Sequence, residues 1–176
     1  MGRLLWGLAV LWAQEVEVRA FLEGREDGII FLELRTSAGT FTLQSYLQKG
    51  RARFHLPVLA GLQEAILSAP GYLPLRHGQP ASLLQKKVWD FTEPGALHAQ
   101  SGFVEKDGKA YLAAGELGRL PSEPYPVINA YDIERFLEAL RQQDLSADFD
   151  NSGRVDEKDY QLLLKNQARL LSTRYD

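Results

Sequence analysis

The chain has 176 residues, 45% of them hydrophobic, and a formal net charge of -3 at pH 7. This length and apolar content are sufficient for one medium-sized domain, or two small ones, with a buried core. The mild acidity argues against a nucleic-acid-binding protein, which would need a basic surface. Cysteine is absent, which excludes disulfides, thiol nucleophiles and thiolate metal sites.

The first 13 residues are typical of a secretory signal peptide. Arg3 supplies a positive charge, residues 4–12 are apolar apart from Gly7, and Ala13 precedes the change to polar residues. The apolar segment is too short to span a bilayer, so we expect no membrane span. We therefore expect an exported protein that is extracellular, periplasmic or at the cell surface. The alternative is a buried N-terminal strand or helix.

Residues 14–118 have the pattern of short β-strands. Charged and apolar residues alternate over residues 15–22, as in a half-buried strand. Similar segments, separated by Gly and Pro, follow at residues 29–35, 40–43, 52–56, 87–92, 103–104 and 110–112. Residues 44–49 and 62–67 could be either strands or helical turns. The regular spacing predicts a small antiparallel β-sandwich.

After Leu120 the pattern changes to that of helices. Residues 121–126 form a proline-rich joint. Apolar residues then recur at helical spacing, first at Ile133, Phe136, Leu137 and Leu140, and less regularly at Tyr160, Leu163, Leu164 and Leu171. We therefore expect residues 119–176 to form a second, small α-helical unit of two amphipathic helices.

An aspartate-rich segment, residues 148–159, lies between the two predicted helices. Oxygen-bearing residues alternate along it, and Gly153 stands where the chain must turn. A Ca²⁺ ion takes about six to eight oxygen ligands, which a loop can supply from alternate positions. The alternative is an acidic turn followed by a capped helix. The predicted ligands are the side chains of Asp148, Asp150, Ser152, Asp156 and Asp159 and the backbone carbonyl of Arg154.

The order of residues 148–159, Asp-x-Asp-x-Ser-Gly-x-Val-Asp-x-x-Asp, resembles an EF-hand loop that ends in Asp instead of Glu. Residues 127–133 repeat the end of this pattern before the first predicted helix. Two Asp-terminated loops, each followed by a helix, resemble the type I dockerin family, whose members are extracellular calcium-binding modules that dock onto cohesin domains. The resemblance covers about residues 113–171.

The dockerin resemblance implies a calcium site in the second repeat and a cohesin-like protein partner. In the first repeat only Asn129 and Asp132, with Glu116 or Glu123, remain as oxygen donors, because prolines and a tyrosine occupy other ligand positions. We therefore expect the first site to be degenerate and to bind calcium weakly or not at all. The residues that correspond to the family's partner contacts are Ala130, Tyr131, Glu157 and Lys158.

Other features of the chain bear on the choice of function. Residues 68–73 resemble the transthyretin-like, or carboxypeptidase-regulatory-like, sandwiches that precede such modules. Trp89 and Phe91 share one strand face and are either core aromatics or a sugar-binding platform. The three histidines have no ligand spacing, and we expect them at the surface or at strand edges. Neither a nucleophile elbow nor a phosphate-binding loop is found, so we expect no enzyme.

Two functions therefore remain. In the first, the calcium-stabilised module attaches this exported, non-catalytic protein to a protein partner. In the second, the β-sandwich binds carbohydrate or a cell surface, and the helical tail is an intramolecular structural element. An exposed Trp89 would favour the second function, whereas an exposed apolar patch on the helical pair would favour the first.

Overall fold

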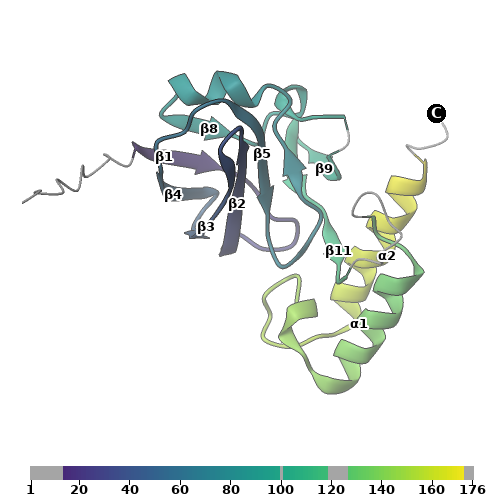
Figure 1. The fold of residues 1–176 in the computed structure, drawn as a ribbon. Helices are drawn as coiled ribbons and strands as arrows, with labels where there is room; N and C mark the ends of the chain where they lie inside the picture. Colours follow the sequence, from purple (N-terminus) through teal and green to yellow (C-terminus); the bar gives the residue numbers. More distant parts are fainter. Residues whose placement is uncertain (1–13, 100, 119–126, 173–176) are drawn as a thin grey trace, which may run out of the picture.

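The computed structural model describes residues 14–99, 101–118 and 127–172, with side chains described as far as Ala168. The described chain is mostly β-sheet with a few helices, which confirms the expectation of a largely β fold. Figure 1 shows the β part followed by two helices at its lower end. The predicted signal peptide, residues 1–13, and the proline-rich joint, residues 121–126, lie outside the described residues.

Two larger sheets form most of the β part. The first is antiparallel and has the strand order β3-β2-β5-β7, with β2 at Gly28–Thr36, β3 at Gly39–Leu47, β5 at Leu62–Ser68 and β7 at Leu75–Arg76. The second has the order β4-β1-β8, with β1 at Gln14–Arg19, β4 at Arg51–Leu56 and β8 at Val88–Asp90. Residues 44–47 and 62–67, for which the sequence left two possibilities, are strand residues. Because β1 is parallel to β8, the prediction of a purely antiparallel arrangement is wrong at this edge.

Smaller elements connect these sheets to the helices. Strand β6, Gly71–Tyr72, pairs with β11, Ala114–Glu116. Strand β9, Phe103–Lys106, forms a hairpin with β10, Lys109–Leu112. Short 3₁₀ helices, η1, η2 and η3, span Pro80–Gln85, Pro94–Ala96 and Leu145–Ala147. The α-helices in the described residues are α1, Ala130–Gln142, and α2, Glu157–Ser172.

The alternating pattern of the strands determines which side chains are buried. Val16 and Val18 of β1 are fully buried, while Glu17, between them, reaches solvent and pairs with Arg19. Trp89 also has no exposed surface, and its indole Nε1 donates a hydrogen bond to the carbonyl of Lys86 at 3.2 Å.

Phe91, on the same strand face as Trp89, is likewise fully buried. A platform that stacks on a sugar must be open to solvent on one ring face. These two aromatics are therefore part of the core, and the alternative of a sugar-binding platform at Trp89 and Phe91 is wrong.

His77 lies just after the edge strand β7, as expected, but it is buried, whereas the other two histidines are exposed. Its ring packs edge-on against Phe91, and its Nδ1 accepts a hydrogen bond from the amide of Gln79 at 3.1 Å. Burial, and then the positive charge of Lys86, lower the pKa of His77 below its ordinary value. His77 is therefore neutral in the folded protein under conditions in which an exposed histidine would begin to charge.

We expect His77 to make the protein less stable as the pH falls from about 7.5 to about 5. The unfolded chain takes up a proton on this residue at a higher pH than the folded chain does, so the free energy of unfolding decreases through this range. Urea unfolding at several pH values, for the wild type and for His77→Gln, measures the effect. The variant should show a shallower pH dependence, and equal slopes would exclude His77 as the cause.

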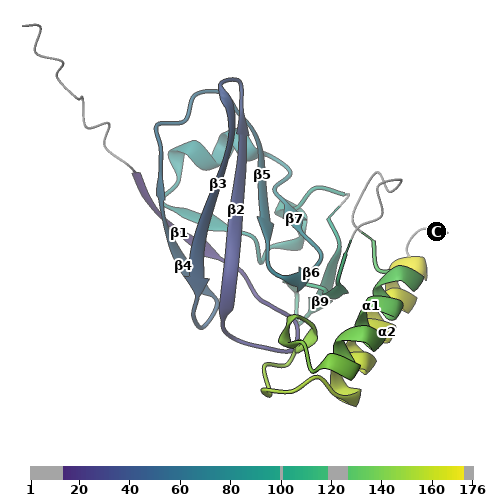
Figure 2. The same cartoon turned by 60° about the horizontal axis from the view of Figure 1, so that its bottom comes forward.

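Helices α1 and α2 lie side by side and run in opposite directions (Figures 1 and 2). The ring of Phe136 on α1 stacks on that of Tyr160 on α2, with 5.3 Å between the ring centroids. Phe136 and Leu163 are fully buried between the elements. Leu137, which the helical spacing placed on the apolar face, is 39% exposed, so that part of the prediction is wrong.

The helical pair is packed on the β part. Helix α2 lies along β11, and the side-chain amide of Asn166 donates hydrogen bonds to the carbonyl of Ala114, at 2.9 Å, and to the carboxylate of Glu23. Lys165 also reaches Glu23, at 3.4 Å. Because Asn166 and Glu23 are almost completely buried, the contact between these two side chains lies inside the protein.

Candidate metal centre

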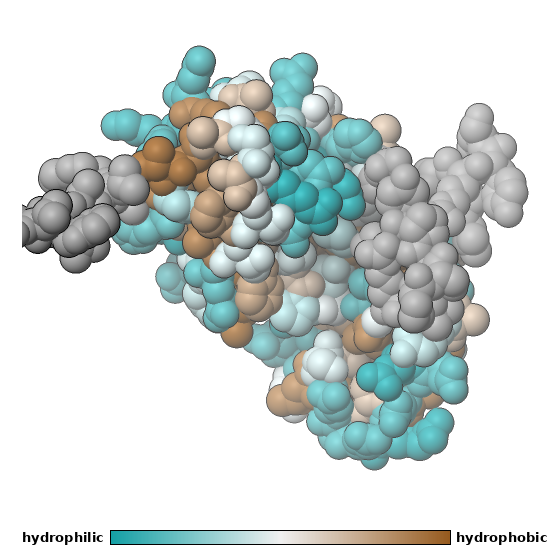
Figure 3. Space-filling model, in the orientation of Figure 1, coloured by the Kyte–Doolittle hydropathy of each residue, from teal (hydrophilic) through white to brown (hydrophobic). Residues whose placement is uncertain are grey.

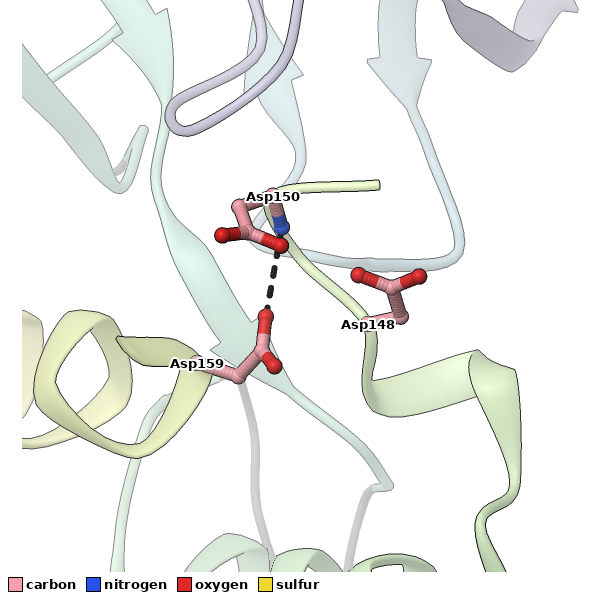
Figure 4. Close-up of side chains that lie close together, drawn as sticks. All are labelled: Asp148, Asp150 and Asp159. Atoms are coloured by element: carbon pink, nitrogen blue, oxygen red, sulfur yellow. Dashed lines mark hydrogen bonds between the residues drawn. The ribbon is translucent and has the colours of Figure 1, made fainter. Parts of the chain in front are cut away.

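Three aspartate carboxylates meet in the loop that precedes α2. Asp148 follows η3, Asp150 lies in the loop, and Asp159 is in the first turn of α2 (Figure 4). One carboxylate oxygen of each lies within 4.8 Å of the corresponding oxygens of the other two. Asp148 and Asp159 are buried, whereas Asp150 is partly exposed. The structure therefore brings together three of the six residues that the sequence predicted as calcium ligands.

Backbone amides of the loop point towards Asp148. One carboxylate oxygen accepts a hydrogen bond from the amide of Ser152 at 3.0 Å, and the other accepts one from the amide of Gly153 at 2.8 Å. Bonds over so few residues require a tight turn, in which Gly153 has a φ of 87°. Glycine suits this position because it has no Cβ to oppose a left-handed conformation.

Asp159 closes the loop from the helix. Its Oδ1 accepts hydrogen bonds from the amides of Phe149, at 2.7 Å, and Asp150, at 3.2 Å, while its Oδ2 accepts one from the amide of Asp156 at 2.9 Å. Burial raises the pKa of Asp159 above its ordinary value, the three amides oppose this shift, and the charge of Asp150 adds to it. A cation bound in the loop would favour the ionised carboxylate.

The pKa of Asp150 moves in the opposite direction. Burial raises it, but hydrogen bonds with Ser152 and Asp148 and the positive charge of Lys158 together lower it by more, so the pKa lies below its ordinary value. Asp150 is therefore a charged oxygen donor at neutral pH, and its charge adds to the effect of burial in raising the pKa of Asp159.

The other three predicted ligands make contacts of their own within the loop. The hydroxyl of Ser152 donates to the carbonyl of Arg154 at 3.2 Å, so these two oxygens lie close together. One carboxylate oxygen of Asp156 accepts from the amide of Lys158 at 2.9 Å, and the other pairs with Nε of Arg154 at 2.9 Å. Asp156 therefore caps α2 and neutralises the Arg154 side chain, a pairing that the sequence did not suggest.

The first repeat has the same closing geometry around Asp132. Its carboxylate accepts hydrogen bonds from the amides of Asn129 and Leu117, each at 2.8 Å. In the second repeat, Asp159 accepts the corresponding two bonds from the amides of Asp156 and Phe149. Leu117 therefore corresponds to Phe149, the second residue of the loop. This correspondence places Glu116, one of the predicted oxygen donors, at the first position of the loop in the first repeat. Residues 119–126, which would complete that loop, lie outside the described residues.

Gln143 has a supporting role that the sequence did not reveal. It ends α1 in a left-handed conformation, with a φ of 54°. Its side-chain amide donates to the carbonyl of Val155 at 3.1 Å and accepts from the amide of Val155 at 3.4 Å. Because Val155 is buried, the Gln143 side chain takes the place of water at the amide and the carbonyl of Val155. No local pattern identifies such a residue, since its partner lies on the far side of the loop.

The four predicted partner-binding residues are accessible to different degrees. Ala130, Glu157 and Lys158 are exposed, whereas Tyr131 is half-buried. Ala130 and Tyr131 lie in the first turn of α1, and the other two lie in the first turn of α2. Because the helices are antiparallel, the two pairs are at opposite ends of the helical pair (Figure 2), so the structure does not bring all four together.

No family model matches the chain, and comparisons with curated proteins and with solved structures also give no match. The dockerin-like and transthyretin-like resemblances therefore stay predictions. Within the described part of the chain, the helices lack the combination of length and apolar character needed to cross a membrane. The function must be argued from the loop and its surroundings.

Proposed function

We propose that residues 148–159 bind one Ca²⁺ ion, which stabilises the helical pair. The observation that carries this proposal is the meeting of three aspartate carboxylates in a loop that is already wound around them. Three like charges, two of them buried, repel one another, and a divalent cation would remove this repulsion. The donors near the loop centre are all oxygens, which suits calcium better than zinc or copper.

We further propose that the protein is an exported, non-catalytic binding protein in which a β-sandwich precedes a dockerin-like module. A single hydrophobic cluster that includes side chains from both larger sheets supports the sandwich. The module would attach to a protein partner, and the resemblance implies a cohesin-like one. On the face shown in Figure 3, the helical pair is mostly hydrophilic with small hydrophobic areas. Leu137 and Leu145, which are 39% and 57% exposed, are apolar side chains that a partner would cover.

A second candidate function is that the helical pair serves only to complete the β part, which itself binds carbohydrate or a cell surface. The hydrogen bonds of Asn166 to Ala114 and Glu23 favour this role, because they fix α2 to the β part. The burial of Trp89 removes one basis for sugar binding. In that case calcium would change the stability of the protein, but it would not promote the binding of any partner to the helices.

Calcium-dependent capture of a partner distinguishes the two functions. We expect the immobilised protein to retain a cohesin-like protein from envelope extracts of the source organism in calcium but not in a chelator. Lys158→Glu, in the first turn of α2, should weaken this binding at least about tenfold, because charge reversal in an interface opposes association. Lys106→Glu, on the exposed hairpin strand β9, is the matched control and should bind normally.

Two results would decide against attachment through the module. One is retention of the same partner in the chelator, and the other is equal binding by the two lysine variants. Calcium stabilisation of each variant, measured in parallel, shows whether the loop itself is still intact. Stabilisation by calcium without any captured partner would favour the second candidate function.

A further inference from the structure

Phe149, the second residue of the metal loop, joins the loop to the β part. Its ring is 1% exposed and lies edge-on to Tyr72 of β6, with 6.1 Å between the ring centroids, and at 6.2 Å from Phe136 of α1. The hydroxyl of Tyr72 is 2.9 Å from the carbonyl oxygen of Phe149 and 3.0 Å from that of Glu23. Tyr72 is therefore a buried donor that faces both units.

Phe149 is also hydrogen-bonded to Asp159, one of the predicted metal ligands. The amide of Phe149 donates to Asp159 at 2.7 Å, while its carbonyl accepts from Tyr72. A single residue of the backbone thus lies between a carboxylate of the metal site and a hydroxyl of the β part. A shift of Phe149 would alter both hydrogen bonds at once.

The β part has two glycines where Phe149 approaches, Gly24 in a turn and Gly71 at the start of β6. A Cβ on Gly71 would lie 2.9 Å from the Phe149 ring, and a Cβ on Gly24 would lie 3.0 Å from its carbonyl oxygen. Cβ atoms in real proteins essentially never come closer than 3.0 Å to such an atom, so a side chain at either position would push Phe149 away. The β part therefore has a socket, formed by Gly24, Gly71 and Tyr72, that fits the second residue of the loop.

We propose that this socket sets the calcium affinity of the loop, so that calcium binding and the docking of the helical pair on the β part reinforce each other. This inference rests on the proposed calcium site. Docking holds Phe149 where its amide orients Asp159, and the ion in turn holds Asp159 and Phe149 in place. Coupling of this kind is reciprocal, so any factor by which docking tightens calcium binding is also the factor by which calcium tightens docking.

Burial supports the role of Tyr72 as a donor. Loss of solvent around the phenol raises the pKa of Tyr72 well above its ordinary value, although the nearby positive charge of Arg25 opposes this. The hydroxyl therefore keeps its proton at neutral pH. Tyr72→Phe removes this donor and leaves the ring in place, so it tests the hydrogen bond alone.

The affinity of the loop for calcium, measured by calorimetry on the full chain, tests the coupling. We expect Tyr72→Phe and Gly71→Ala each to weaken calcium binding about tenfold, because both loosen the hold on Phe149. Gly108→Ala is the matched control for Gly71→Ala. Both glycines have a positive φ, 70° at Gly108 and 81° at Gly71, but a Cβ at Gly108 meets nothing within 4 Å. The control should therefore suffer the same backbone strain without any loss of affinity.

A distance measurement tests docking directly and does not depend on the stability of the variants. Because the chain lacks cysteine, the double variant Lys106→Cys, Arg141→Cys can be spin-labelled only at these two exposed sites, on β9 and α1. We expect one narrow distance distribution in calcium and a broader one in a chelator. Tyr72→Phe in this background should broaden the distribution further at the same calcium concentration.

The outcomes separate this inference from the proposal on which it rests. If the wild type binds no calcium, both are wrong. If the wild type binds calcium but Tyr72→Phe and Gly71→Ala bind it as tightly as Gly108→Ala, only the coupling is wrong. Identical distance distributions with calcium and with chelator would also overturn the coupling.

Discussion

Asp159→Ala is expected to abolish calcium binding and to destabilise the protein even without calcium. Asp159 is fully buried and accepts hydrogen bonds from three backbone amides of the loop. Each buried donor that loses its acceptor costs about 1–3 kcal/mol, and neighbouring losses are not additive. We therefore expect a loss of about 3 kcal/mol in the free energy of unfolding, measured by urea denaturation of metal-free protein.

Two further variants separate charge from hydrogen bonding at this position. Asp159→Asn keeps the shape and one acceptor oxygen but lacks the charge, so it should lose calcium binding and less of the stability. Glu105→Gln removes one exposed negative charge on β9, far from the loop, and should change neither property. An Asp159→Ala protein that calcium stabilises as much as the wild type would exclude Asp159 as a ligand.

Trp89→Ala is expected to cost about 3–5 kcal/mol, which is typical of a large aromatic removed from a core. Trp89 lies in β8, which pairs in parallel with β1, and it has no exposed surface. Its Nε1–H also bonds the carbonyl of Lys86, a group that would lose its partner. Thermal and urea unfolding of the variant measure the loss, and calcium should still stabilise what remains folded.

This substitution also bears on the choice of function. Trp89→Phe fills most of the same space and should cost less than Trp89→Ala, as expected when packing is the main contribution. A sugar-binding tryptophan would behave in another way: its replacement would leave the free energy of unfolding nearly unchanged and abolish sugar binding. That second result would contradict the assignment of Trp89 to the core.

Local patterns in the sequence were sufficient for most strands and for the grouping of three aspartates in one loop. Alternation in β1 predicted which of its side chains are buried, because the period of a strand is fixed by its geometry. The spacing of Asp148, Asp150 and Asp159 predicted a group that the structure brings together. These features depend on residues close together in the chain, and sequence reasoning is strongest there.

Features that depend on distant residues could not be predicted. The parallel pairing of β8 with β1 joins segments separated by most of the β part, and no local signal marks it. The contacts of Asn166 with Glu23 and of Tyr72 with Phe149 are of the same kind. The pairing of Asp156 with Arg154 and its cap on α2 were also not predicted, because a short carboxylate near a helix start has several competing partners.

A calorimetric titration of metal-free protein with calcium tests whether residues 148–159 bind an ion. We expect one ion bound per chain, and no binding by Asp159→Asn. At a calcium concentration about 100 times the Kd, one site that binds only the folded state adds about 2.7 kcal/mol to stability, which corresponds to a rise of about 5–10 °C in Tm. No heat of binding, together with an unchanged Tm, would show that residues 148–159 are an acidic loop and not a metal site.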